Sequence, residues 1–151
     1  MTGEAYYQHS GKFSPGGILM GLLVGTLIGI LAAGVYGYLI FYNPLVYINF
    51  LASLGFGAVV GIAASGALRW RNVRNVWVTR LVTVVVGLIA FYASWAVWIY
   101  ALLRRADQDV SLLPIVLQPA VLLDLIQQVN AVGAWTIRGS TPTGLVLWII
   151  W

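Results

Sequence analysis

The sequence predicts an all-α integral membrane protein, and two observations carry that prediction. Hydrophobic residues make up 61% of the 151 residues and charged residues only 8%, whereas a soluble domain carries about 25% charged residues. No charged side chain occurs between Lys12 and Arg69, or between Arg80 and Arg104. Because a helix crosses the hydrocarbon core in about 20 residues, the first stretch holds two spans and the second holds one.

Prolines that follow a capping residue predict where the helices begin, since proline suits the first helical position and Ser or Asn can cap the free N–H groups. The pairs Ser14-Pro15 and Asn43-Pro44 start two spans, and Asn75 caps a third. The connection at Asn43 is so short that the first two spans form a tight antiparallel hairpin. A single membrane domain (1–151) therefore comprises an N-terminal arm (1–14), span 1 (15–41), span 2 (44–68), a basic loop (69–75) and span 3 (76–103).

The remaining chain is predicted to be an extramembrane segment, 106–141, followed by the start of a fourth span, 142–151. Within the segment, a short amphipathic helix begins at Pro119 and ends near Gly133. We expect this helix to lie at the membrane interface or to dock onto a partner. The ten residues of 142–151 would rise about 15 Å as a helix, roughly half the hydrocarbon thickness. We expect the chain to be truncated within this span, or its end to be buried against another subunit.

Small residues recur at four-residue intervals along both helices of the hairpin. In lipid, such stripes let helix backbones approach closely. The pattern resembles the glycine zippers of channel and oligomeric membrane proteins, and the resemblance implies close packing of spans 1 and 2. Either the two stripes pack against each other, or one also packs neighbouring subunits into a ring. The predicted helix-packing residues are Gly17, Gly21, Gly25, Gly29, Ala33 and Gly37 in span 1, and Ser53, Gly57, Gly61 and Ser65 in span 2.

The hairpin is also similar to that of the proteolipid of rotary ATPases. That family needs a carboxylate in the middle of its second helix, and span 2 has none. The sequence therefore departs from the family at the residue on which its function depends.

Four arginines, Arg69, Arg71, Arg74 and Arg80, gather in and beside the basic loop. The positive-inside rule explains them as topology determinants that contact lipid headgroups, so the N-terminus is expected on the cytoplasmic side of a membrane such as a bacterial inner membrane. A cytoplasmic acidic partner is the alternative. Nucleic acid is not expected as a partner, because phosphate tracking needs a basic face that the spans leave no room for.

Aromatic residues near the ends of the spans predict belts at the two membrane interfaces. Trp70 and Trp77 mark one interface, and Tyr42, Trp95 and Trp98 mark the other. A slot for a quinone or a lipid, lined by Phe91, Trp95 and Trp98, is the alternative.

No catalytic, cofactor-binding or metal-binding residue is predicted. The sequence has no cysteine, its single histidine, His9, lies in the N-terminal arm, and no span has an acidic residue, histidine or lysine at its centre. Haem ligation and proton relays within the membrane need such groups, and a nucleophilic serine needs a base beside it. We therefore expect a protein that is not an enzyme and has no cofactor.

The function predicted from these features is that of a non-catalytic membrane subunit which packs into, and stabilises, a larger membrane protein complex. The alternative is a homo-oligomeric channel or permeation unit built on the zipper helices. Besides the lipid bilayer, the expected partners are other membrane subunits, contacted through the amphipathic helix. The predicted contact residues are Leu122, Asp124, Leu125, Ile126, Gln128 and Val129.

Overall fold

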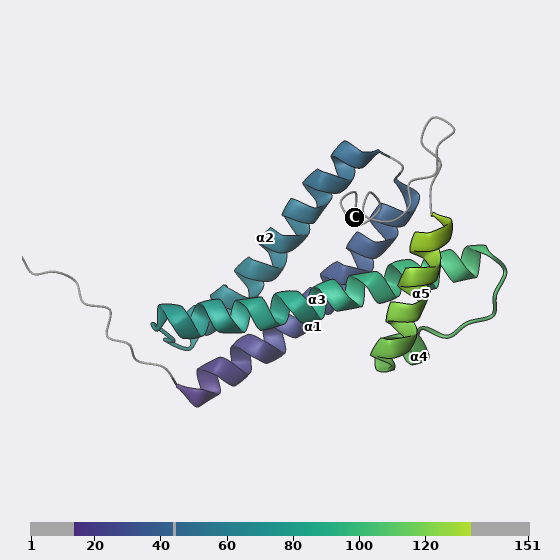
Figure 1. Ribbon diagram of the computed structural model, residues 1–151. Coiled ribbons are helices and arrows are strands. Elements are labelled where there is room, and N and C mark those ends of the chain that lie inside the picture. The colour runs from purple at the N-terminus through teal and green to yellow at the C-terminus, as the bar shows by residue number, and fades with distance from the viewer. Residues whose placement is uncertain (1–13, 44, 134–151) are drawn as a thin grey trace, which may run out of the picture.

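The computed structural model describes residues 14–43 and 45–133, which form five helices and no strand (Figure 1). The helices are α1 (Pro15–Tyr42), α2 (Val46–Trp70), α3 (Val76–Arg105), α4 (Leu112–Leu117) and α5 (Pro119–Val132). The first three are long and apolar enough to cross a membrane, so the chain is a multi-pass membrane protein. The predicted start of a fourth span, 142–151, lies outside the described residues, as does nearly all of the N-terminal arm.

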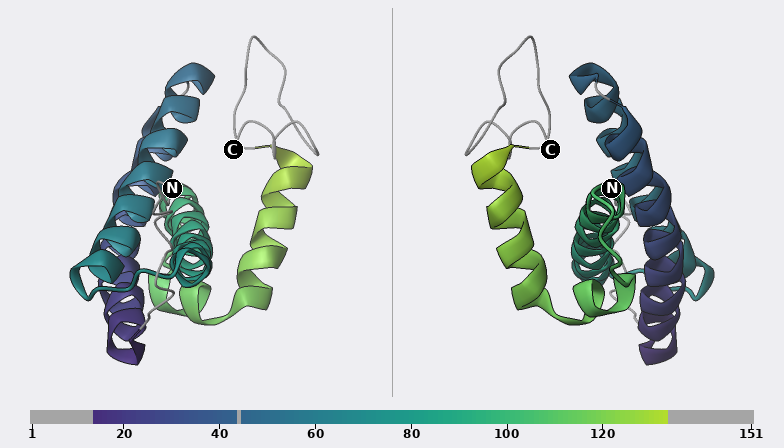
Figure 2. Two further views of the ribbon diagram at one scale, coloured as in Figure 1. Left: turned by 90° about the vertical axis from the view of Figure 1, so that its left-hand side faces the viewer. Right: turned by 90° about the vertical axis from the view of Figure 1, so that its right-hand side faces the viewer.

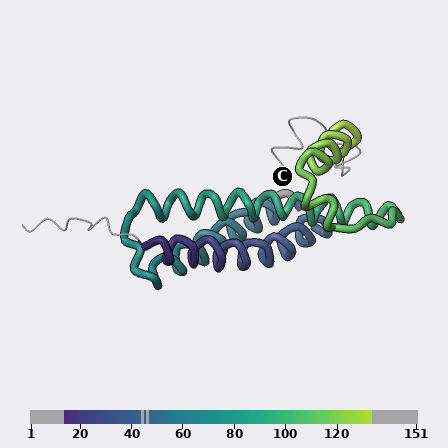
Figure 3. The backbone as a smooth tube through the Cα atoms, turned by 90° about the horizontal axis from the view of Figure 1, so that it is seen from below, coloured from purple at the N-terminus to yellow at the C-terminus, as the bar shows by residue number. Residues whose placement is uncertain are grey.

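Helix α1 is the central element of the bundle, because it packs along both α2 and α3. Helices α1 and α3 lie side by side and run in the same direction. Helix α2, which connects them in the sequence, runs in the opposite direction (Figures 1 and 3). Helix α5 crosses the second half of α3 at a steep angle, and α4 joins the two (Figures 1 and 2). The three spans therefore form one bundle, with α4 and α5 attached to one side of it.

The starts of α1 and α3 are where capping chemistry predicts them. The Ser14 hydroxyl accepts a hydrogen bond from the Gly17 N–H at 3.0 Å, and Asn75 Oδ1 accepts from the Trp77 N–H at 3.0 Å. Each bond satisfies an N–H that has no partner within the helix.

Helix α2 begins at Val46, two residues after the predicted start. The reason lies in the side chain of Asn43, which was expected to cap a helix that starts at Pro44 but forms its hydrogen bonds further along the chain. Its Oδ1 accepts from the Leu45 N–H at 3.3 Å, and its Nδ2 donates to Oδ1 of the buried Asn49 at 2.8 Å. The Asn43 side chain thus bridges the turn to the second turn of α2, and the helix starts later.

Helices α2 and α3 each extend two residues beyond the predicted ends, and both close with the same backbone motif. Asn72 (φ 57°) and Asp107 (φ 56°) adopt the left-handed conformation. The next N–H bonds back to the last turn, from Val73 to the Leu68 carbonyl at 3.1 Å and from Gln108 to the Leu103 carbonyl at 3.2 Å. This Schellman geometry satisfies carbonyls at the end of each span.

The interior consists of two clusters at opposite halves of the bundle. The cluster nearer the α2–α3 turn is aliphatic and is made of Val60, Ala64, Leu68, Val73, Val82, Val86 and Ala90. The other is richer in aromatic residues and also holds α4 and α5. Its members are Tyr36, Ile40, Trp95, Ala96, Trp98, Ile99, Ile115, Leu122 and Ile126.

Candidate functional site

The small residues of α1 form a buried groove along the whole helix. All six predicted positions, Gly17, Gly21, Gly25, Gly29, Ala33 and Gly37, are buried. The space beside them is too small for a side chain. A Cβ added at Gly25 would lie 3.0 Å from the Ala64 Cβ and 3.1 Å from the Val86 Cγ1. The groove therefore receives α2 and α3 together.

Larger side chains of the neighbouring helices fill this groove. Leu68 of α2 occupies the space at Gly21, where a Cβ would lie 2.6 Å from its Cγ. On the other side, Ala90 of α3 lies 3.0 Å from the position that a Cβ would take at Gly29. In lipid, close approach and dispersion must hold spans together, and a groove that accepts aliphatic side chains provides both.

The predicted stripe of span 2 does not pack against the stripe of span 1. A Cβ added at Gly57 or Gly61 would meet nothing within 4 Å. Ser65 bonds to the Ile62 carbonyl of its own helix, and of the four residues only Ser53 reaches α1, through a hydrogen bond with Tyr36. The expectation of two facing small stripes was wrong, because α2 turns its Val60, Ala64 and Leu68 toward α1 instead. A groove is better filled by a ridge than by a second groove.

As a result, the glycines of α2 lie beside open space. Gly55, Gly57 and Gly66 are exposed, Gly61 is half-buried, and none of the four would place a Cβ within 4 Å of a neighbour. Gly57 and Gly61, one turn apart, share one side of the helix, whereas Gly55 and Gly66 lie on the opposite side. Phe50 and Leu54 are exposed on the same side as Gly57 and Gly61. The side of α2 that carries Gly57 and Gly61 is called the α2 outer face below.

The predicted contact face of the amphipathic helix packs in part against the chain itself. Leu122 and Ile126 are buried in the aromatic cluster, and the half-buried Leu125 and Val129 pack against the same cluster. Burial leaves Leu122 and Ile126 almost no surface for a partner, and contact of the other predicted residues with a partner stays a prediction. Asp124 and Gln128 are exposed, and the Gln128 Nε2 donates to an Asp124 carboxylate oxygen at 2.9 Å.

A partly buried hydrogen bond joins α4 to α3. The Tyr92 hydroxyl donates to the Val116 carbonyl at 2.8 Å. This carbonyl lies at the break between α4 and α5, where Pro119 interrupts the chain's own N–H donors. The Tyr92 hydroxyl therefore satisfies a carbonyl at an interruption of regular helical hydrogen bonding.

Removing this hydroxyl by Tyr92→Phe is expected to loosen α4 and to lower the free energy of unfolding by about 1 kcal/mol, since an acceptor loses its donor. Hydrogen exchange of the 112–118 amides should become faster, and thermal unfolding in detergent should shift downward. Tyr47→Phe is the matched control, because that side chain is 87% exposed. Equal exchange in both variants would contradict the role given to Tyr92.

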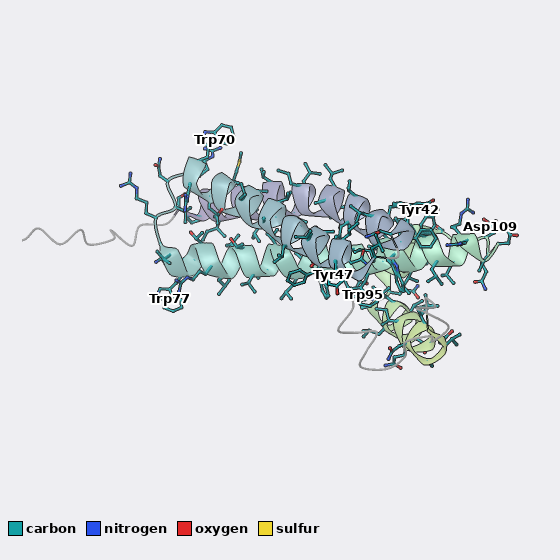
Figure 4. All side chains as sticks on the ribbon, turned by 90° about the horizontal axis from the view of Figure 1, so that it is seen from above. Tyr42, Tyr47, Trp70, Trp77, Trp95 and Asp109 are labelled. Atoms are coloured by element: carbon teal, nitrogen blue, oxygen red, sulfur yellow. The ribbon has the colours of Figure 1, made fainter. Side chains whose placement is uncertain are left out.

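The four arginines of the basic loop lie where the sequence places them, at one end of the bundle. Arg69, Arg71, Arg74 and Arg80 are all exposed. The Arg80 guanidinium lies 5.3 Å from the centre of the Trp77 ring. Figure 4 shows Trp70 and Trp77 at this end and Tyr42 toward the opposite end, near Asp109.

Trp95 and Trp98, in contrast, do not belong to an aromatic belt. Both are buried in the aromatic cluster, with ring centres 5.7 Å apart, and Trp98 has no exposed surface. The space of the alternative quinone slot is filled by these rings and by Phe91, whose centre lies 6.4 Å from that of Trp95. Their proximity to the end of α3 suggested an interface, but the packing of α4 and α5 covers them.

Within residues 14–43 and 45–133, no group of three His, Asp or Glu side chains is arranged to hold a metal ion. No protein-family model, curated protein or solved structure matches the chain.

Proposed function

We propose that this chain is a non-catalytic membrane subunit that packs into a larger complex through the α2 outer face. The observation that supports this is that Gly57 and Gly61 share one side of α2 and would meet nothing within 4 Å, which leaves a shallow surface on a spanning helix. Lipid tails gain little from such a surface. A neighbouring helix gains close backbone contact there, which is the main source of helix association in membranes.

The flanking side chains fit the same role. Phe50 and Leu54 are exposed on the same side of α2, two turns before Gly57 and Gly61, so they would contact an approaching helix and supply dispersion contacts. A second contact is proposed at the exposed polar side of α5, where Asp124 and Gln128 already form a hydrogen-bonded pair. Uncharged and acidic groups suit a protein surface better than anionic headgroups.

We further propose that the arginine end of the bundle faces the cytoplasm, as the positive-inside rule requires of Arg69, Arg71 and Arg74. The Schellman turn at Asn72 holds this loop close to the membrane end of α2. The loop charges can then reach the phosphates of anionic lipids while the spans stay in the hydrocarbon.

The experiment is affinity purification of the tagged full chain in mild detergent, followed by mass spectrometry. The wild type should recover other membrane polypeptides. Gly61→Leu should lose them, because a leucine there obstructs the approach of another helix. Gly87→Leu is the matched control, since a Cβ at Gly87 also meets nothing within 4 Å but lies on α3.

Two results would contradict the proposal. Recovery of the chain alone as a symmetric oligomer would make it a homo-oligomer, the alternative function. Unchanged recovery with Gly61→Leu would show that the α2 outer face is not the contact.

A further inference from the structure

A cavity of about 710 Å³ lies between the ends of α1 and α3 that point away from the arginine loop. Its walls come from Tyr38, Phe41 and Tyr42 of α1 and from Tyr100, Arg104 and Arg105 of α3. A volume between about 300 and 1,000 Å³ is typical of small-molecule sites. The cavity combines aromatic walls with two guanidinium groups, and its lining includes no carboxylate.

The two arginines are not equivalent. Arg104 forms an ion pair with Asp109 at 3.2 Å, and both side chains are well exposed. Arg105 lies instead over the Phe41 ring, 5.7 Å from its centre. Within the described part of the chain, no carboxylate forms an ion pair with Arg105. The cation–π contact orients this guanidinium toward α1 while its hydrogen-bond donors stay unneutralised by an acidic side chain.

The backbone carbonyls at the end of α3 already accept hydrogen bonds, so they are not available to the Arg105 guanidinium. The Leu102 and Leu103 carbonyls accept from the Ala106 N–H, and the Arg104 carbonyl accepts from the Asp107 N–H. The negative end of the helix is therefore occupied by its own turn. Three tyrosines add hydroxyl groups beside the arginines, so the cavity is rich in donors that suit a phosphate.

The position of the cavity favours the phosphate of a phospholipid over a soluble phosphate. The ends of two spans and the α1–α2 turn meet here, and Tyr42 lies near Asp109 at this end of the bundle (Figure 4). Phospholipid phosphates occupy this level of a membrane, and tyrosine favours it. The aromatic walls suit the glycerol and upper acyl groups below the phosphate, for which a soluble phosphate has no counterpart.

From these contacts we infer that the α1–α3 cavity binds the phosphate of an anionic phospholipid, with Arg105 as the principal cation. The site is distinct from the arginine loop, which lies at the opposite end of the bundle. It does not depend on the proposed complex, because every residue of its lining belongs to this chain.

The test is native mass spectrometry of the full chain in detergent with phosphatidylglycerol added. The wild type should retain one lipid, and Arg105→Gln should weaken retention about tenfold, as expected when a charge-assisted hydrogen bond is lost. Arg105→Lys should restore most of it, because the charge returns. Tyr47→Phe is the control, since it removes a polar group from an 87% exposed side chain that does not line the cavity.

Three outcomes would overturn the inference. One is equal retention by wild type and Arg105→Gln, and another is equal loss with Tyr47→Phe. The third is equal retention of phosphatidylcholine, because a zwitterionic headgroup does not need an unpaired cation. Inorganic phosphate at millimolar concentration is a separate arm: displacement of phosphatidylglycerol by it would assign the site to a soluble phosphate instead of a lipid. Unchanged thermal unfolding of Arg105→Gln without lipid would show that the variant is folded.

Discussion

Replacing Gly25 by leucine should push α1 away from both neighbouring spans, and we expect a large loss of stability. Its Cβ would lie 3.2 Å from the Ala64 Cα, a backbone atom, as well as close to Val86. No change of rotamer can move a backbone atom away, so α1 must separate from both α2 and α3. Overpacking of this kind costs about 1–3 kcal/mol, and here two interfaces share the strain. Thermal unfolding in detergent micelles measures the effect.

Gly57→Leu is the control for that experiment. It makes the same substitution on a neighbouring span, at a position where a Cβ meets nothing within 4 Å. Its unfolding temperature should stay close to that of the wild type, although association with a partner should suffer. If both variants unfold at the same temperature, the α1 groove is not what holds the spans together.

The contrast between these two glycines shows how far the sequence alone could lead. The four-residue spacing predicted one face of α1 on which all six small residues are buried. The same spacing in α2 predicted the wrong face. Periodicity identifies residues that share a face, but it does not say which neighbour the face meets. A groove needs a ridge opposite it, and the series Val60, Ala64 and Leu68 in α2 was the available signal.

The spans themselves were predictable to within two residues at each end. Charge-free stretches set their length, and Ser14 and Asn75 make the expected caps. The ends of α2 and α3 were missed because Asn72 and Asp107 take a left-handed conformation in which glycine is more common. Of these two residues, Asn72 could have indicated the helix end in the sequence, since asparagine tolerates the left-handed conformation better than most residues.

The burial of Leu122 and Ile126 by the chain itself was not predicted, for a related reason. An apolar stripe shows that Leu122 and Ile126 must be buried, but not whether the same chain buries them. Helix α4 was not predicted at all. Its six residues are too few for a helical period to be visible, and Pro114 stands among them. Because α4 was not predicted, nothing in the sequence indicated that the chain turns back after α3 and packs α5 against it.

The position of α4 leads to a second expected result: this helix should lie within the hydrocarbon, below the membrane surface. Tyr92, whose hydroxyl bonds to the Val116 carbonyl, lies 13 residues before Arg105 in α3. That separation is about 20 Å along a helix. If Arg104 and Arg105 reach the headgroups, the α4–α5 break lies far below them.

The side chains of α4 fit that depth. Ile115 is buried against α3, whereas Leu113 and Leu117 point outward and are 67% and 72% exposed. Leucines on the outward side of a short helix are unfavourable in water and favourable in lipid. Asp124 limits how deep α5 can lie in the membrane, because an exposed carboxylate in hydrocarbon is costly. We therefore expect helix α4 to be the deepest part of a re-entrant segment, with the polar side of α5 facing the interface or a partner.

Cysteines placed in this cysteine-free chain test the depth directly. In sealed vesicles, Leu117→Cys should react with a water-soluble maleimide at least about tenfold more slowly than Gln108→Cys, because a thiolate neither forms nor meets the reagent in hydrocarbon. Asn72→Cys should be protected from reagent on the side that labels Gln108→Cys, since the two loops lie at opposite ends of α3. Denaturation in SDS should make all three reactive. Equal rates at Leu117→Cys and Gln108→Cys before denaturation would place α4 in water, and the Tyr92 hydroxyl would then bond to a carbonyl that water could have satisfied.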